Sequence, residues 1–266
     1  MKLSEIKYEK RAIFLGDQGT GKTRLLGTLC QLVPTVLVTS DLQGLATIRN
    51  MPECDLEIVY VENWDNIWDY YQQIAKAVKA GAQAIAVDDF GGTQEQLARR
   101  LNLKPKDMAE ARTEPSKRQE DIRKAMMMGS RRLLLQQWGE MALGTESWLY
   151  EILQLPVDVK WFTVLSGLRD HPRTGEDWLM PELMGQARDR ILAKFGLVVN
   201  TFHTLHKGAV YWCATSKPHP RIPTKDRYSQ PRTWVDPTAA KILQHIIGKE
   251  EAETSTEKEI GTGITS

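Results

Sequence analysis

Short apolar runs alternate with amphipathic stretches along the first half of the chain. Runs of strand length, rich in apolar and β-branched residues, occur at 12–15, 35–39, 56–61 and 84–87. The stretch from Asn63 to Gly81 carries apolar residues at helical spacing and ends at a glycine, which is typical of a helix. The run 84–87 is apolar throughout, as expected for a strand buried on both faces of a parallel sheet. Strands that alternate with helices predict βαβ units.

The second half has a different pattern. Residues 94–153 carry little strand signal and predict helices with a charged loop around 104–116. Further strands are predicted at 161–166, 195–199 and 210–215, the last two joined by a hairpin turn at Lys207-Gly208. We expect a long loop at 167–185, a last helix at 237–247 and a disordered acidic tail at 249–266.

Composition limits the class of protein. The chain has 266 residues, 41% of them hydrophobic, and a formal net charge of +1. These values favour a folded domain and exclude a uniformly basic nucleic-acid binder, so any such surface has to be local. The three cysteines are scattered, which favours reduced thiols. We find no leader-like segment and no membrane-length apolar run, and we expect a soluble, cytoplasmic protein with no membrane partner.

The motif with the clearest chemistry follows the first apolar run. It matches G-x-x-x-x-G-K-T and consists of Gly16, Asp17, Gln18, Gly19, Thr20, Gly21, Lys22 and Thr23. A strand before it and a helix after it are the context that a phosphate-binding loop (P-loop) requires. The glycines let backbone N–H groups face a phosphate chain, and the helix N-terminus adds a positive end. Lys22 is expected at the β- and γ-phosphates and Thr23 at Mg²⁺, so ATP and Mg²⁺ are the predicted ligands.

Acidic residues at strand ends complete this prediction. Asp88 ends the apolar run 84–87 and is expected to hold Mg²⁺ as the Walker B carboxylate. Asp89 either shares that role or points away. Asp41 follows the strand 35–39 and is expected to orient the attacking water, with a turn-forming role as the alternative. Glu62 ends the next strand and is the competing base.

The order of these elements resembles the ATPase core of the RecA family, because two strands separate the P-loop helix from the Walker B strand. The C-terminal half resembles a narrower group, the short phage-encoded RecA-like ATPases linked to single-strand annealing recombination. The segments that carry this resemblance are Pro181–Gln186, Phe195–Val199 and Thr224–Arg227.

The resemblance covers about residues 10–247 and implies an α/β fold. The implied RecA-like P-loop NTPase core has a mostly parallel sheet flanked by helices, with a C-terminal β-hairpin. It fills a domain at 1–248, with a helical, basic excursion at about 91–153.

The same resemblance implies roles for particular residues. The carboxylate at the position of Asp41 is the catalytic one in RecA, which has Glu there. Lys225 and Arg227 are implied to act as cationic fingers on the nucleotide of a neighbouring subunit, and hence in a homo-oligomer, either a ring or a filament. A solvated basic loop is the alternative for that segment. Because Asp41 is one methylene shorter than the Glu of RecA, we expect slow hydrolysis. Ser166 stands near the place where relatives often carry a Gln or His sensor.

Local charge suggests single-stranded DNA as a partner. Eleven Lys/Arg and five Asp/Glu lie between Arg99 and Arg132. Loops at about 91–130 and 167–187 face DNA in RecA-like assemblies, and the second contains Arg169, Arg173 and Trp178, which suit phosphate contact and base stacking. Solvated helix faces are the alternative interpretation of these charges.

The leading hypothesis is therefore an ATP-hydrolysing, phage-type recombination protein that promotes annealing or strand exchange. A single-strand-binding protein is a further candidate partner, and a bacterial host is the expected cell if the chain is phage-encoded. The alternatives are an AAA-type ATPase that loads or remodels a protein or helicase, and a P-loop kinase of small substrates.

Overall fold

The computed structural model describes residues 9–102, 135–170, 177–183, 187–249 and 252–264. The strands are β1 (Lys10–Gly16), β2 (Thr35–Thr39), β3 (Leu56–Tyr60), β4 (Ala84–Asp88), β5 (Val159–Asp170), β6 (Asp177–Pro181), β7 (Leu197–His206), β8 (Ala209–Thr215), β9 (Lys225–Asp226) and β10 (Thr233–Val235). The helices are α1 (Lys22–Cys30), α2 (Ala46–Arg49), α3 (Ile67–Ala80), α4 (Phe90–Asn102), α7 (Leu135–Gln154), α8 (Ala187–Ala193), α9 (Ala239–Ile246) and α10 (Ser255–Ile264).

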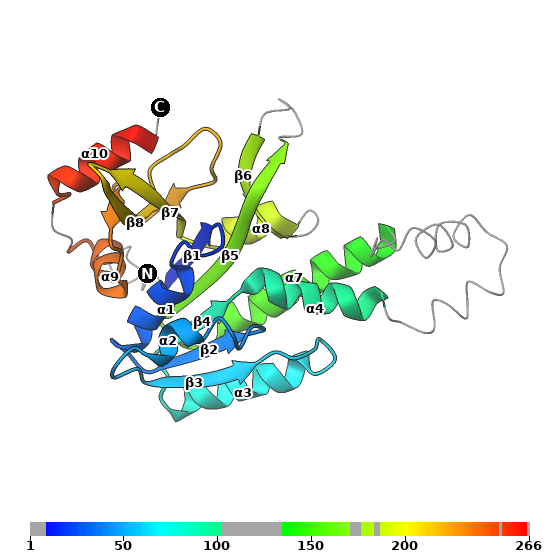
Figure 1. The fold of residues 1–266 in the computed structure, drawn as a ribbon. Coiled ribbons are helices and arrows are strands. Elements are labelled where there is room, and N and C mark those ends of the chain that lie inside the picture. The colour runs from blue at the N-terminus through cyan, green and yellow to red at the C-terminus, as the bar shows by residue number, and fades with distance from the viewer. Residues whose placement is uncertain (1–8, 103–134, 171–176, 184–186, 250–251, 265–266) are drawn as a thin grey trace, which may run out of the picture.

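One sheet organises the molecule, in the order β10-β8-β7-β1-β5-β4-β2-β3 (Figure 1). The strands from β7 to β3 are parallel, and β8 and β10 lie beside β7 as antiparallel neighbours. Two strands, β2 and β3, lie between helix α1 and the Walker B strand β4 along the chain. This topology confirms the predicted fold class, a RecA-like core with a mostly parallel sheet and a C-terminal hairpin.

Alternating side chains of the central strands build a core on each face of the sheet. Along β1, Ile13 and Leu15 pack in the cluster that includes α3, α4 and α7, whereas Ala12 and Phe14 pack in the cluster that includes α1 and α9. All four side chains are almost completely buried. Burial of both faces explains why these strands appear in the sequence as continuous apolar runs.

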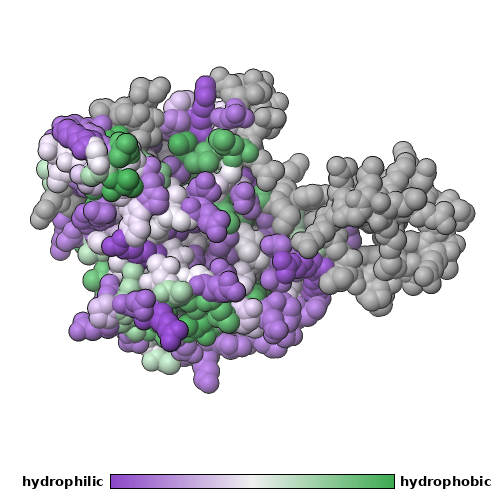
Figure 2. Space-filling model, viewed as in Figure 1, coloured by the Kyte–Doolittle hydropathy of each residue, from purple (hydrophilic) through white to green (hydrophobic). Residues whose placement is uncertain are grey.

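The surface is mostly hydrophilic, with separate hydrophobic patches, one of them over β2 and β3 (Figure 2). Leu42 and Ile58 are about half exposed in this region and line an open pocket beside α2. Among the described residues, no helix is long and apolar enough to span a membrane.

The β7–β8 hairpin forms where the sequence predicts it. Lys207 and Gly208 have φ angles of 48° and 81° and connect the two strands. Positive φ at both positions matches the right-handed twist of the strands.

The segment 167–185 differs from the long loop that we expected. Strand β5 continues to Asp170, and β6 returns antiparallel to it, with Arg169 opposite Trp178. The sequence pattern is weak here because the side chains of β6 are only partly buried, so burial does not impose clear alternation. Backbone pairing in this ladder replaces the hydrogen bonds that a loop would make with water.

The predicted disordered tail is also wrong in part, because residues 255–264 form α10. Thr254 and Glu257 make a capping box: the Thr254 N–H donates to Glu257 Oε2 (2.8 Å), and the Glu257 N–H donates to Thr254 Oγ1 (3.2 Å). Glu257 also accepts from Arg232 Nη2 (3.2 Å), and Ile260 is buried. The acidic composition suggested disorder, but these acids have basic partners in the fold. The signal that could have found α10 is the spacing T-x-x-E.

The cysteines differ from expectation as well. We expected three reduced thiols, but the structure joins Cys30, the last residue of α1, to Cys54, which precedes β3. The third cysteine, Cys213, is buried in β8. Sequence separation gave no indication of the pair, because the turn through α2 is what brings the two residues together.

Two glutamates of α10 provide a matched test of this docking. Replacement Glu257→Ala removes one partner of a buried pair with Arg232, and we expect it to lower the free energy of unfolding by roughly 3 kcal/mol. Glu259→Ala removes an exposed partner of Lys207 and should leave the free energy of unfolding nearly unchanged. Urea denaturation of both variants measures the difference. Equal effects would contradict the docking of α10.

Candidate functional site: a phosphate-binding loop and its carboxylates

The P-loop leaves the sheet at the carboxyl end of β1. Gly16 lies so close to β7 that a Cβ there would overlap Thr201 Oγ1. That hydroxyl donates to Leu15 O (2.9 Å) and contacts Thr20 Oγ1 (2.8 Å). Gly19 and Gly21 adopt φ angles of 77° and 85°, which glycine alone takes without strain. Strand β7 therefore holds the loop in a conformation that depends on its glycines.

Helix α1 begins inside the motif. Gly21 is its N-cap residue, and within the described part of the chain no side chain caps this end. The first N–H groups of the helix are therefore directed at the space above the loop, where the helix dipole favours an anion.

Lys22 lies at the centre of the loop. Its Nζ donates to the carbonyl oxygens of Gly16 (2.8 Å) and Asp17 (2.7 Å), and the side chain is buried. Burial lowers the pKa of the Lys22 ammonium below its ordinary value. Four carboxylates oppose this lowering, in decreasing order Asp89, Asp88, Asp17 and Glu182. The site thus combines one buried cation with four carboxylates whose charges act on it.

Asp88 connects three elements of the site. Its Oδ2 accepts a hydrogen bond from Thr23 Oγ1 (2.7 Å) on α1, and its Oδ1 accepts one from Thr163 Oγ1 on β5. Burial raises the pKa of the Asp88 carboxyl, although both hydroxyls and the charge of Lys22 act to lower it. A threonine hydroxyl and a carboxylate side by side are the hard oxygen ligands that Mg²⁺ requires, so these residues fit that ion.

The structure adds two acids to the site. Asp89 Oδ1 accepts a hydrogen bond from the Gly91 N–H (2.9 Å), and burial raises the pKa of Asp89 to about 6. Glu182 follows β6, and its N–H donates to Leu165 O (2.6 Å), which brings it beside Gly167. In the sequence, the end of an apolar strand marks Asp88 but leaves the direction of Asp89 open. Glu182 carries no chemical signal of its own there, and the β5–β6 hairpin is what returns it to the loop.

Of the two predicted bases, Asp41 lies nearer to Asp88 than Glu62 does. Asp41 is exposed and its Oδ1 accepts from the Gln43 N–H (2.9 Å), so it forms a turn. Its charge nevertheless contributes to the raised pKa of Asp88, which places it near the site. Glu62 is exposed and follows β3, the outermost strand, two strands away from β4.

Lys225 and Arg227 lie near the amino ends of β1 and β7, away from the P-loop. Strand β9 pairs with Leu197 and Val198, which are level with Ala12 and Ile13 of β1 and distant from its carboxyl end. Lys225 Nζ donates to Leu192 O (3.0 Å) at the end of α8, and burial, followed by the charge of Arg227, lowers its pKa to about 8. These residues are therefore remote from the P-loop of their own chain.

Between them, Asp226 has a structural role that the sequence did not suggest. Its buried carboxylate hydrogen-bonds His245 Nε2 of α9 and accepts from the N–H groups of Tyr228 (3.0 Å) and Ser229 (3.1 Å). Burial tends to raise the pKa of Asp226, but these hydrogen bonds together hold it below its ordinary value.

The predicted DNA contacts are only partly described. Arg169 and Trp178 occupy opposite positions of the β5–β6 hairpin, which extends beyond the carboxyl ends of the parallel strands (Figure 1). Arg173 and most of the basic stretch between Arg99 and Arg132 lie outside the described residues.

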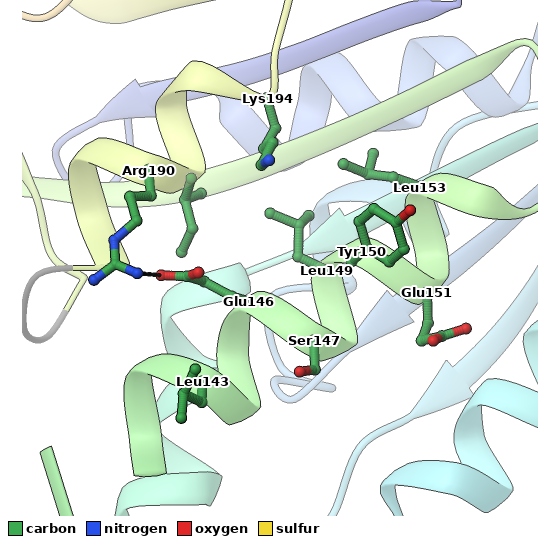
Figure 3. A pocket seen from close by; sticks show the side chains of 10 residues that line it. Leu143, Glu146, Ser147, Leu149, Tyr150, Glu151, Leu153, Arg190 and Lys194 are labelled. Carbon is green, nitrogen blue, oxygen red and sulfur yellow. Dashed lines mark ion pairs between the residues drawn. The ribbon is translucent and has the colours of Figure 1, made fainter. Parts of the chain in front are cut away.

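A second pocket lies away from these residues. Its volume is about 270 Å³, and it lies between α7 and α8, where Arg190 reaches Glu146 at 3.3 Å (Figure 3). None of the predicted site residues lines it. The P-loop, where Lys22, Thr23 and Asp88 come together, is therefore the candidate site.

Two adjacent substitutions test which residue of the Lys225–Arg227 segment stabilises the fold. Asp226→Ala leaves His245 buried without its acceptor, and we expect it to lower the free energy of unfolding by roughly 2–4 kcal/mol. Arg227 is exposed, so Arg227→Ala should change that free energy little. Because the pKa of Asp226 is lowered in the folded state, its contribution is present above the unfolded pKa and is lost as pH falls through the folded pKa. Urea titrations at pH 7 and at low pH measure both effects. Equal stability of the two variants would refute the assignment.

No protein-family model matches the chain, and no curated protein matches it either. Among solved structures, the chain is similar to the flagellar accessory protein FlaH from Methanocaldococcus jannaschii, with 11% identity and a TM-score of 0.43. The similarity covers 85% of this chain and 85% of that one.

Proposed function

We propose that this chain is a RecA-like ATPase that binds single-stranded DNA as an oligomer and promotes annealing or strand exchange. The observation that supports the ATPase part is the convergence of Lys22, Thr23 and Asp88 at the N-terminus of α1. Lys22 Nζ is hydrogen-bonded to the phosphate loop, and beside it Thr23 and Asp88 form a hydroxyl–carboxylate pair.

The residues of the loop divide the work of phosphate binding. Backbone N–H groups of the loop and of the first turn of α1 donate to the phosphate oxygens. The Lys22 ammonium, with the surrounding carboxylates to balance it, supplies the positive charge at the β- and γ-phosphates. Thr23 and Asp88 are the residues that would hold Mg²⁺. When bound, the ion screens the charge of the terminal phosphates.

Asp89 is the better-placed carboxylate for orienting the attacking water. Asp89 is largely buried, and its charge and that of Lys22 act on each other, so it lies near the ammonium that we expect at the terminal phosphates. One of its oxygens accepts from Gly91, which holds the side chain in a fixed orientation. Asp41, the base predicted from the sequence, is exposed and uses one oxygen in its own turn. Asp41 remains the second candidate.

Two features support a DNA partner on the same side of the sheet. Helix α4 begins directly after Asp88 and Asp89 and leads into the basic stretch that starts at Arg99. The β5–β6 hairpin returns to the site through Glu182, whose carbonyl oxygen lies beside Gly91. Both predicted DNA segments are thus connected to the acids beside the P-loop, namely Asp88, Asp89 and Glu182. A change at these acids on nucleotide binding can therefore alter the position of both segments.

The position of Arg227 supports an oligomer. Its backbone N–H donates to Gly196 O (3.0 Å), just before β7 and away from the carboxyl ends of the strands, and its exposed side chain belongs to a wide basic pocket that also includes Lys10 and Lys194. A cation there cannot serve the P-loop of its own chain, but it is available to a neighbouring subunit. An AAA-type ATPase that acts on a protein would use the same arrangement and is the alternative function.

Hydrolysis tests the site directly. Lys22→Ala should abolish Mg·ATP hydrolysis and most of the affinity, because it removes the main cation at the phosphates. Asp89→Asn should retain ATP binding but lower kcat by roughly 10² or more, the scale of a positioned base. Steady-state turnover together with ATP titration separates the two effects.

Glu62→Gln, which replaces an exposed carboxylate just after the outermost strand, is the matched control and should leave kcat within a few-fold of the wild type. If Asp41→Asn reduces kcat by that factor while Asp89→Asn does not, the assignment of the base to Asp89 is wrong. Turnover that survives in a folded Lys22→Ala protein would exclude the P-loop as the catalytic site.

DNA binding tests the remaining part of the proposal. Labelled single-stranded oligonucleotide should bind, without marked sequence preference, when a non-hydrolysable ATP analogue is present, and its affinity should fall steeply with salt. The double variant Arg169→Ala, Arg173→Ala should make the salt dependence shallower by roughly 0.7 log units for each phosphate that is no longer neutralised. Fluorescence anisotropy at several salt concentrations measures the slope.

The matched control is Lys76→Ala, Lys79→Ala, which removes two cations from α3 on the outer part of the sheet. This pair should leave the slope unchanged. If wild-type protein at micromolar concentration and low salt binds no single-stranded DNA, the recombination function fails and the protein-directed ATPase becomes the better account.

A further inference from the structure

The β7–β8 hairpin extends beyond β1 and presents one face beside the P-loop. Along β7, Leu197 and Val199 pack on the side of the sheet that α1 and α9 cover. Because side chains alternate along a strand, Thr201, His203 and Leu205 continue this face outward. Thr201 contacts the P-loop through its hydroxyl, so His203 and Leu205, the next residues on this face, extend beyond the loop.

Three planar side chains gather at this point. Trp212 of β8 is directly opposite His203, with ring centroids 5.9 Å apart and planes inclined by 24°. The guanidinium carbon of Arg24, in the first turn of α1, lies 3.9 Å from the centroid of the Trp212 ring. A Cβ on Gly21 would lie 3.8 Å from the same indole. The group therefore lies beside the P-loop.

The face beyond Trp212 is apolar and open to solvent. Leu205 and Val210 form the next cross-strand pair, and their side chains are 72% and 71% exposed. Exposed apolar side chains at the edge of a polar site are typical of a surface that receives a partly apolar ligand.

The site also has a direction. The carboxylates Asp88 and Asp89 lie at the end of β4, which is separated from β1 by β5, whereas the β7–β8 hairpin lies on the opposite side of β1 (Figure 1). A triphosphate with its γ end at Lys22 and these acids therefore has its α end toward Arg24. The nucleoside leaves the loop on the side of Trp212.

We propose that Arg24, Trp212 and His203 form a platform for the nucleobase of the bound nucleotide. The inference rests on the proposed binding of a nucleoside triphosphate by the P-loop. The flat guanidinium, supported by the indole beneath it, offers stacking and a cation–π contact to any base, since every base has a π face. Leu205 and Val210 flank the platform on its outer side.

The experiment compares a ligand that has a base with one that lacks it. Binding of the non-hydrolysable ATP analogue and of inorganic tripolyphosphate, each with Mg²⁺, is measured by isothermal titration calorimetry. Trp212→Leu keeps apolar volume in the hairpin but removes the aromatic face. We expect it to weaken analogue binding roughly tenfold and to leave tripolyphosphate binding unchanged, because Trp212 carries no charge.

Two further variants complete the design. Trp212→Phe retains an aromatic ring and should keep most of the analogue affinity, which also shows that the hairpin tolerates replacement. Trp68→Ala, which removes a 59% exposed tryptophan from α3, is the matched control and should change neither affinity.

The outcomes separate this inference from the function on which it rests. If the wild type binds neither ligand, nucleotide binding itself is refuted. If the wild type binds both and Trp212→Leu binds the analogue as tightly as the wild type does, the platform alone is refuted. An equal loss for both ligands in Trp212→Leu would show that Trp212 supports the loop through Gly21 and not the base.

Discussion

The parallel pairing of β1 between β5 and β7 is the constraint on which the rest of the structure depends. Its register places Gly16 level with Leu165 on one side and Thr201 on the other. The carboxyl ends of parallel strands lie at the same end of the sheet, so the P-loop, Asp88 and the β5–β6 hairpin all lie there. The loop conformation follows from this pairing, because Thr201 of β7 fills the space that a side chain at position 16 would need.

Electrostatics at that edge is set by burial. Lys22, Asp88 and Asp89 are largely shielded from water. Burial lowers the pKa of the lysine and raises the pKa of the two aspartates, so it favours the neutral form of each group. Threonine hydroxyls and backbone N–H groups supply the hydrogen bonds that the buried carboxylates need. Such an arrangement suits a ligand that adds both negative charge and a divalent cation, since the acids then bind the cation and the lysine binds the phosphates.

The C-terminal segments stabilise the side of the sheet opposite to the acids. Asp226 joins β9 to α9 through His245, and Glu257 joins α10 to Arg232. Charged residues that look interchangeable in the sequence therefore have different roles. Asp226 and Lys225 make hydrogen bonds within the chain, whereas the side chain of Arg227 is exposed. The Lys-Asp-Arg sequence thus combines two residues that bond within the chain with one exposed cation.

The sequence by itself determined the sheet-forming runs, the P-loop with Lys22 and Thr23, and Asp88, because these depend on local spacing and on strands buried on both faces. It also predicted the hairpin turn at Lys207-Gly208, which requires positive φ at two adjacent residues. Only the tertiary structure decided which further groups surround the loop. The presence of Asp89 in the site depends on the direction of its side chain. The presence of Glu182 depends on the β5–β6 hairpin, which is only partly buried and gives a weak sequence pattern. Trp212 lies on a strand far along the chain from Gly21, and yet a Cβ at that glycine would lie 3.8 Å from its indole. The same reason explains α10, whose acids are stable in a helix because basic side chains of other segments lie opposite them. The local pattern reflects interactions between residues that are close in the sequence, whereas these contacts join distant segments that only the folded sheet brings together.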